Sequence, residues 1–173
     1  MNQQGAITDT FVKKVFAHLD NTDVNKLGDF LSLFQSGSAK IILNSQPFGD
    51  PTQFLTLWQQ QVVATQHTVQ SVDFHLIPGS GMVVCNVTAK VRFDESGRDK
   101  AGVDATIRDA NGSGATPRRG AGNHTPRTQW GPYFGISLQL VLNESIYRNS
   151  FQGCINAFNY SIVYKPSDTL MQV

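Results

Sequence analysis

Two side chains suited to acid–base chemistry, Asp73 and His75, lie two positions apart in an alternating stretch at 65–77. Side chains on a strand alternate between its two faces, so this carboxylate and this imidazole point to the same side. Such a pair could abstract a proton or assist a dehydration. However, the apolar residues Val72, Phe74 and Leu76 occupy the alternate positions and claim the core side of the strand. We therefore expect Asp73 and His75 on the outer side, and we predict no catalytic residues.

The other histidines and the cysteines do not form a pattern typical of metal or nucleophile chemistry. His18, His67 and His124 are scattered, and Cys85 and Cys154 are far apart in the sequence. A zinc site would need closely spaced ligands, such as two histidines at i and i+4 or a Cys-x-x-Cys pair. The sequence also lacks a nucleophile elbow and a phosphate-binding glycine loop. We expect solvated or singly hydrogen-bonded histidines, no metal and no cofactor.

A long segment between 94 and 129 has no apolar periodicity and contains several glycines. Irregular segments of this length are typically functional or disordered, so we expect a mobile insertion at about 97–129 in a single domain spanning 1–173. Its second part carries Arg118, Arg119 and Arg127 without any acidic residue. Guanidinium groups bind phosphate well, so these arginines could contact RNA or a pre-ribosomal particle. The alternative is a loop that is merely kept soluble by its charge.

Overall composition excludes some classes of protein. The net charge of the 173 residues is +1, so bulk basicity gives no argument for nucleic-acid binding. The first residues are polar and lack the apolar region of a secretory signal. No apolar run approaches the ~20 residues that cross a bilayer. We therefore expect a soluble, intracellular protein without membrane insertion.

Apolar periodicity predicts three helices ahead of most of the strands. Residues at helical spacing between 11 and 19 indicate the first helix, for which Thr8 or Asp9 would be the N-cap. The second helix would be capped by Asp23. A short strand at 39–43 comes next, and the third helix would begin with Asp50 as the cap and Pro51 at the first helical position.

Four longer alternating stretches, at 65–77, 82–93, 130–142 and 155–164, indicate strands. Together with the helices they predict an α+β fold, in which three helices pack on a strongly curved antiparallel sheet. The concave side would be lined by Phe, Leu, Val and Ile, with only Tyr133, Tyr160 or Tyr164 available as polar tips. An enzyme that used this cone as its active site would need more convergent polar groups there.

The opposite, convex face of the sheet is polar but carries little charge. Antiparallel sheets often have one wet face, so an ordinary solvent-exposed surface is one interpretation. The scarcity of charge favours the other interpretation, a face that packs against a protein partner. The residues predicted to bind this partner are Asn86, Thr88, Lys90, Tyr133, Ser137, Gln139, Asn159 and Ser161.

Three segments of the chain resemble a known family. They are PFGDPTQFLTLWQQQVVATQHTVQSVDFHLIPGSGMVVCNVTAKVRFDESGRDK, WGPYFGISLQL and FNYSIVYKP. Together they resemble the small subunits of the fungal mRNA export receptor, the mRNA transport regulators, which have the nuclear transport factor 2-like fold. The resemblance extends from about residue 7 to residue 166, and the order of helices and strands agrees with it.

This resemblance implies a non-catalytic subunit that pairs, through the outer sheet face, with a nuclear transport factor 2-like domain of a large subunit. As a heterodimer the pair would contact nucleoporin repeats and carry mRNA, and also large ribosomal subunits, through nuclear pores. It would reside in the nucleus and at the pore and shuttle to the cytoplasm. Two alternatives are a small isomerase or dehydratase that uses the cone as an active site, and a homodimeric carrier of Ran. The apolar cone disfavours the first, and the long insertion disfavours the second.

Overall fold

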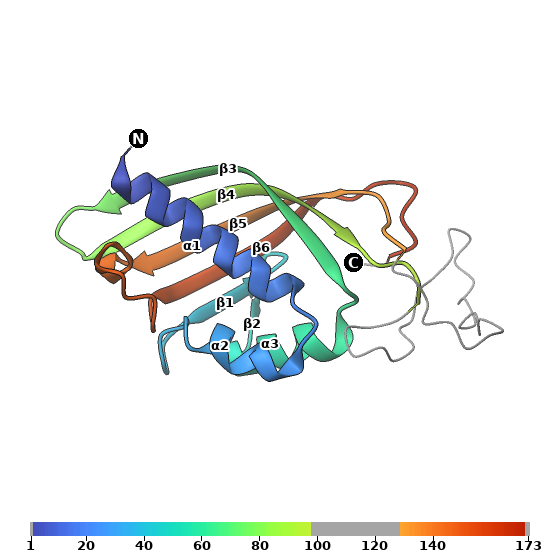
Figure 1. Cartoon of the computed structure of the whole chain (residues 1–173), viewed down its shortest axis with the longest axis horizontal. Helices are drawn as coiled ribbons and strands as arrows, with labels where there is room; N and C mark the ends of the chain where they lie inside the picture. Colours follow the sequence, from blue (N-terminus) through green and yellow to red (C-terminus); the bar gives the residue numbers. More distant parts are fainter. Residues whose placement is uncertain (1, 98–128, 172–173) are drawn as a thin grey trace.

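The computed structural model of the protein describes residues 2–97 and 129–171 (Figure 1). In chain order the elements are α1 (Gln3–Asp20), the 3-10 turn η1 (Val24–Lys26), α2 (Leu27–Leu31), β1 (Lys40–Leu43), β2 (Gln46–Phe48), α3 (Pro51–Gln61), β3 (Thr65–Ile77), β4 (Met82–Phe93), β5 (Phe134–Asn143), the 3-10 turn η2 (Glu144–Arg148) and β6 (Ile155–Tyr164). The predicted α+β class is confirmed, with three helices and a six-stranded curved sheet.

The sheet has the strand order β2-β1-β6-β5-β4-β3. The long strands β3 to β6 form an antiparallel meander, but β1 runs parallel to β6. The sheet, which was predicted to be antiparallel, is therefore mixed, because one of its five strand pairings is parallel. After β1 and β2, helix α3 carries the chain to the far edge of the sheet, and the meander then returns strand by strand. The last strand of the meander, β6, lies beside β1 and runs in the same direction.

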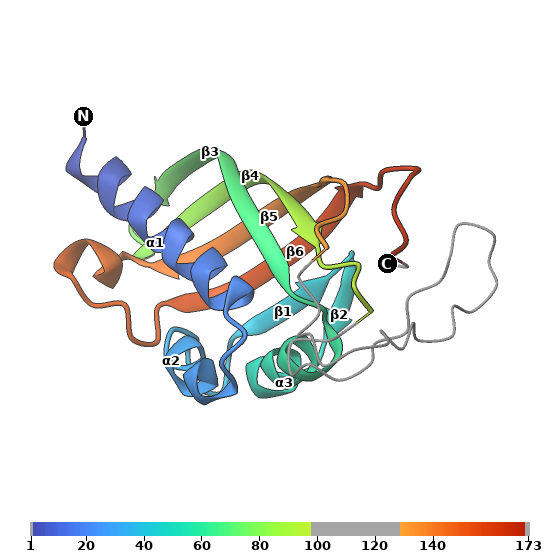
Figure 2. The same cartoon turned by 45° about the vertical axis from the view of Figure 1, so that its right-hand side comes forward.

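The helices cover one face of the sheet. Figures 1 and 2 show α1 lying across the long strands, while α2 and α3 lie at the β1–β2 end. Every second residue of β4 and β5 is buried. This confirms the predicted alternation, because these side chains face the helices and their neighbours face outward. The largest buried side chains are aromatic and include Phe11, Phe54, Phe134, Phe158 and Tyr160.

The helix starts differ in part from the predicted ones. Helix α1 begins at Gln3, and its N-cap is Asn2, six residues before Thr8 and seven before Asp9; the Asn2 side chain accepts from the Gln4 N–H at 3.1 Å. Thr8 lies inside the helix, where its hydroxyl donates to the Gln4 carbonyl at 2.8 Å. That local hydrogen bond lets a typical capping residue occupy a helix interior.

The second and third helices agree better with the sequence. Asp23 does accept a backbone N–H, from Asn25 at 3.0 Å, but it opens a 3-10 turn before the short α2 instead of one continuous helix. Asp50 caps α3 as predicted, accepting from the Gln53 N–H at 2.8 Å, and Pro51 is the first helical residue. In the described part of the chain, no helix is long and apolar enough to cross a membrane.

Candidate partner-binding face

The outer face of the sheet carries two uncharged rows of side chains in register across β4, β5 and β6. Asn86, Gln139 and Asn159 are direct neighbours in the first row. Thr88, Ser137 and Ser161 form the second row in the same way. Within the first row the Asn159 side-chain amide donates to Gln139 Oε1 at 3.2 Å. The structure therefore brings these six of the predicted partner-binding residues together as one neutral polar surface, the central rows.

Asp73 and His75 lie at one side of this face, on β3, and both are exposed. Asp73 is the register partner of Asn86, so it continues the first central row toward the sheet edge. The prediction that both side chains point away from the interior is confirmed. Neither side chain faces the concave side, where a substrate of a cone-shaped enzyme would bind.

The remaining two predicted residues, Lys90 and Tyr133, belong to a different group at the end of the face. The Lys90 ammonium lies 4.4 Å from the centroid of the Tyr133 ring, although Tyr133 precedes β5 and does not belong to the strand. The Arg92 guanidinium lies 5.0 Å from the Trp130 ring and 5.4 Å from the Tyr133 ring. Such cation–π contacts hold long charged side chains in place over aromatic faces.

Tyr164 extends this group, contrary to the prediction that it faces the core. A register shift follows Ile162, so that Ile162 pairs with Ile136 while Tyr164 pairs with Gly135. The extra residue, Val163, reverses the alternation, and Tyr164 is 61% exposed. We call Lys90, Arg92, Trp130, Tyr133 and Tyr164 the aromatic–cation end of the outer face.

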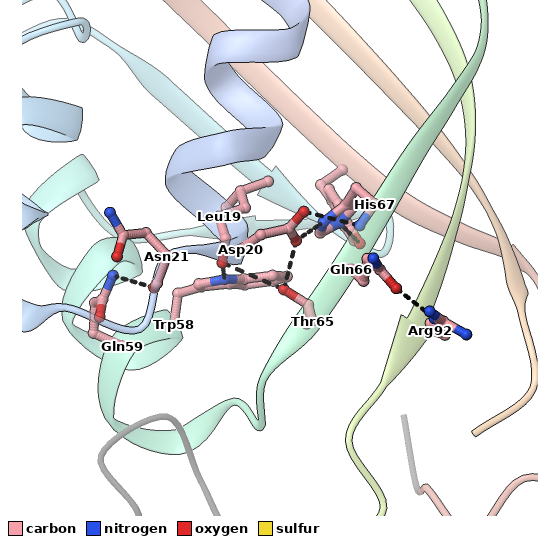
Figure 3. Close-up of polar contacts among 10 residues, drawn as sticks. Leu19, Asp20, Asn21, Trp58, Gln59, Thr65, Gln66, His67 and Arg92 are labelled. Carbon is pink, nitrogen blue, oxygen red and sulfur yellow. Dashed lines mark hydrogen bonds and ion pairs between the residues drawn. The ribbon is translucent and has the colours of Figure 1, made fainter. Parts of the chain in front are cut away.

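The interior contains a polar network that the sequence analysis missed (Figure 3). The His67 side chain is fully buried, with Nδ1 2.5 Å from Asp20 Oδ1 and Nε2 2.9 Å from the Tyr160 hydroxyl. The same Asp20 carboxylate accepts from the Thr65 hydroxyl at 2.9 Å. The expectation of solvated or singly hydrogen-bonded histidines is thus wrong for His67. Of the three tyrosines proposed as inner polar tips, only Tyr160 is buried, whereas Tyr133 and Tyr164 lie outside.

The protonation pattern of this network follows from burial. Burial, and after it the charge of Asp20, raises the pKa of Tyr160 well above its usual range. The hydroxyl therefore stays protonated, so it is able to donate to His67 Nε2 in the tautomer whose Nδ1–H donates to Asp20. The imidazole is also enclosed by rings, with Phe16 stacked at 4.8 Å and Trp58 at 6.3 Å between centroids.

The His67 and Tyr160 side chains of this network are shielded from solvent. Around the described residues, one hollow lies between α1 and β3 and another beside the β1–β2 turn, and neither is lined by Asp20, His67 or Tyr160. Trp58 Nε1 donates to the Leu19 carbonyl at 2.8 Å, so the indole closes the cluster at the end of α1. We interpret the network as a structural bridge between α1, β3 and β6.

No sequence signal could have revealed this arrangement. The inward positions at the start of β3 are Thr65, His67 and Val69, which have odd numbers, whereas Val72, Phe74 and Leu76 have even numbers. An irregularity between Val69 and Ser71 exchanges the two faces. The stretch around it, TVQSVD, is too evenly polar to show where the alternation breaks.

The two ends of the insertion meet at a buried carboxylate. Asp94 Oδ1 accepts from the Ser96 and Gln129 backbone N–H groups, both at 2.9 Å, and the side chain is almost fully buried. Gly131 N–H donates to the Phe93 carbonyl at 2.9 Å, which continues the pairing of β4 with the segment before β5. The predicted RNA-contacting Arg118, Arg119 and Arg127, and the mobility expected at about 97–129, concern residues 98–128 and lie outside the described residues.

A comparison with protein-family models places this arrangement in a family. Residues 2–173 match the model of the nuclear pore RNA shuttling protein Mtr2. The chain belongs to the Mtr2 family. It is 52% identical over 170 residues to the mRNA transport regulator of Saccharomyces cerevisiae, a match that covers 98% of this chain and 92% of the relative. It is 34% identical over 142 residues to the mRNA transport regulator of Candida albicans, with 79% of this chain and 74% of the relative covered.

Solved structures support the same assignment. The C. albicans Mtr2 in a crystal structure with the Mex67 M domain is 29% identical, with a TM-score of 0.72, and 94% of this chain and 97% of that chain are covered. Nuclear transport factor 2 of Cryptosporidium parvum is 13% identical with a TM-score of 0.56, covering 91% and 93% of the two chains, which shows the shared fold alone. The predicted nuclear transport factor 2-like fold is confirmed.

Membership in the Mtr2 family also bears on catalysis, because the family consists of transport factors and not of enzymes. The prediction that the chain is not an enzyme agrees with this. Among the residues that the structure describes, no three His, Cys, Asp or Glu side chains are grouped to hold a metal ion. Cys85 and Cys154 are both buried and free.

Proposed function

We propose that this chain is the small subunit of a heterodimeric receptor that exports mRNA through the nuclear pore, and that its outer sheet face binds the M domain of a Mex67-type large subunit. The observation that carries this proposal is the similarity to C. albicans Mtr2, which was crystallised as a complex with the Mex67 M domain. The family description, a nuclear pore RNA shuttling protein, supports the same role and a location at the pore with shuttling to the cytoplasm.

The central rows support the choice of surface. Six neutral polar side chains lie in register there, and the charged groups Asp73, Lys90 and Arg92 lie at the margins of the same face. The cores of protein interfaces are poor in charged residues, because an unpaired charge loses its hydration there. A face of this kind can be covered by another domain without leaving a buried charge unpaired.

The large subunit would gain stability from the pairing, because a partner that binds only the folded form shifts the folding equilibrium by mass action. The heterodimer, and not this chain alone, would then present the surface that meets nucleoporin repeats. We further propose that Arg118, Arg119 and Arg127 contact RNA or the large ribosomal subunit during export, since clustered guanidinium groups bind phosphates.

The decisive experiment is co-purification with the M domain after charges have been placed in the central rows. Gln139→Lys combined with Ser137→Glu should weaken the heterodimer strongly, because binding would have to desolvate two charged side chains in place of two neutral ones. Asp73→Asn combined with His75→Ala, at the side of the same face, provides a control for general changes in this surface. If the heterodimer forms equally well with Gln139→Lys and Ser137→Glu, the interface lies elsewhere.

A further inference from the structure

The aromatic–cation end of the outer face has a property that the central rows lack, namely fixed positive charge. Arg92 Nε donates to Gln66 Oε1 at 2.5 Å, and the guanidinium group lies over the Trp130 and Tyr133 rings. The cation is therefore held by three neighbours before any partner arrives. An arginine fixed in this way loses little conformational entropy on binding and offers a fork of N–H donors that matches a carboxylate.

The two cations have no carboxylate partner within the described part of the chain. The ion pairs found there involve Lys13, Lys26 and His67, and neither Lys90 nor Arg92 takes part in one. Asp94 and Glu95 follow Arg92 in the sequence, but their carboxylates bind other groups. Asp94 accepts from Ser96 and Gln129, and Glu95 Oε1 accepts from Thr169 at 2.8 Å and from Leu170 at 3.0 Å.

Exposed aromatic rings belong to the same end of the outer face as these two cations. Trp130 and Tyr133 are each 37% exposed, and Tyr164 is more exposed than either. Tryptophan, tyrosine and arginine are the residue types that most often carry the binding energy of protein interfaces. The position also fits, since Lys90, Gly135 and Tyr164 are register partners and lie one row beyond Thr88, Ser137 and Ser161, a spacing of about 7 Å.

We propose that Arg92, steadied by Trp130 and Tyr133, receives an acidic side chain of the partner domain and is the energetic anchor of the heterodimer. Lys90 reinforces the positive potential, and the Tyr133 and Tyr164 rings exclude water around the ion pair. This inference rests on the proposed function, because it assigns a partner chemistry to one end of the same face. RNA phosphate would also suit a guanidinium, but the direct continuity with the central rows favours a protein carboxylate.

The test compares Arg92→Gln with Lys14→Gln, which removes the same charge from the exposed, helix-bearing side of the molecule. Binding of each variant to the M domain is measured by surface plasmon resonance, and thermal unfolding confirms that each is folded. We expect Arg92→Gln to weaken binding about ten-fold or more, as for an interface hot spot, and Lys14→Gln to leave it unchanged. The affinity of Arg92→Lys for the M domain should lie between those of the wild type and Arg92→Gln, because lysine keeps the charge but lacks the forked pair of N–H donors.

A second measurement separates electrostatics from simple loss of packing. The difference between the wild type and Arg92→Gln should be larger at about 0.01 M than at about 1 M ionic strength, where the screening length falls from about 30 to about 3 Å. The acidic residues of the M domain are then replaced by serine, one at a time. One of these M domain variants should bind the wild-type chain and Arg92→Gln with the same affinity, because the partner of Arg92 is already lost. If no such residue exists, the carboxylate pairing is refuted.

The outcomes distinguish this inference from the proposed function. If Gln139→Lys with Ser137→Glu breaks the heterodimer and Arg92→Gln behaves like Lys14→Gln, the interface stands and the anchor is wrong. If Arg92→Gln leaves the M domain affinity unchanged but lowers the affinity for single-stranded polyuridine, the aromatic–cation end is an RNA surface and the inference is overturned. If neither set of variants affects the heterodimer, both proposals fail.

Discussion

Asp20 binds His67 at two points. Its Oδ2 accepts from the His67 backbone N–H at 2.9 Å, while its Oδ1 contacts the ring Nδ1. Asp20 is the last residue of α1, where the negative end of the helix dipole disfavours a carboxylate. Its hydrogen bonds to the edge strand β3 offset that penalty and fix the end of α1 against the sheet.

The first prediction concerns this attachment. Asp20→Ala should lower the free energy of unfolding by on the order of 3 kcal/mol, since each buried donor that loses its acceptor costs ~1–3 kcal/mol. Urea unfolding measures the effect. Asp9→Ala, which removes an acid of the same helix from an exposed pair with Lys13, is the matched control and should cost less than about 1 kcal/mol. Equal effects of the two substitutions would show that the Asp20–His67 contact adds no particular stability.

The second prediction concerns pH. Burial, followed by the charge of Lys14, lowers the pKa of His18 below its ordinary value of 6.5, while Asp29 opposes the shift. The unfolded chain therefore binds a proton at this site more tightly than the folded chain does. The stability linked to His18 is complete above pH 6.5 and decreases as the pH falls below that value.

Thermal unfolding at a series of pH values tests this sign. His18 stacks on Phe30 at 5.0 Å, so His18→Phe keeps a ring there but removes the titrating group. The loss of stability between neutral and mildly acidic pH should be smaller in His18→Phe than in the wild type. An unchanged or steeper loss in the variant would mean that His18 does not contribute in the stated direction.

The third prediction concerns the cysteines. Burial, and after it the charge of Asp73, raises the pKa of Cys85 to about 12, and burial raises the pKa of Cys154 to about 12. Because the thiolate is the reactive form, both thiols should resist iodoacetamide at neutral pH while the chain is folded. Mass spectrometry of native and urea-unfolded protein gives the comparison. Fast modification of either cysteine in the native protein would contradict the burial described here.

The fourth prediction concerns the insertion. Replacing residues 98–128 by a short glycine–serine turn should leave the melting temperature and M domain binding nearly unchanged, because Asp94 already joins the two ends at Ser96 and Gln129. A longer deletion that also removes Asp94 and Gln129 is the control, and it should destabilise the domain. The idea of a separable insertion would be abandoned if the short replacement unfolded the protein.

The sequence was sufficient to predict which side chains face the core wherever inward and outward residues alternate along a strand without interruption. Alternation over 82–93 and 134–142 correctly separated core residues such as Val87 and Leu138 from outer residues such as Thr88 and Gln139. The Asp50–Pro51 start of α3 was equally readable, because capping and proline chemistry are local.

The sequence did not predict the arrangement where tertiary contacts override the local alternation of apolar and polar residues. The irregularities near Gln70 in β3 and Val163 in β6 exchange the two faces of their strands, which moved His67 inward and Tyr164 outward. Tertiary packing also decides that β1 pairs with β6 in parallel, since the two strands are more than a hundred residues apart in the chain. Arg92 and Trp130 meet only because the insertion returns to its starting point.

The place of β6 in the sheet has a consequence for synthesis of the protein. The final strand in the sequence lies between β1 and β5 and pairs with both, so the sheet has a gap until residues 155–164 have left the ribosome. The nascent chain up to η2 would expose two unpaired strand edges, which are prone to aggregation. Pairings this distant in sequence also slow folding, because a long loop must close before they form. From this topology we expect the nascent chain to depend on chaperones during translation. We also expect it to be protected against aggregation soon after β6 emerges.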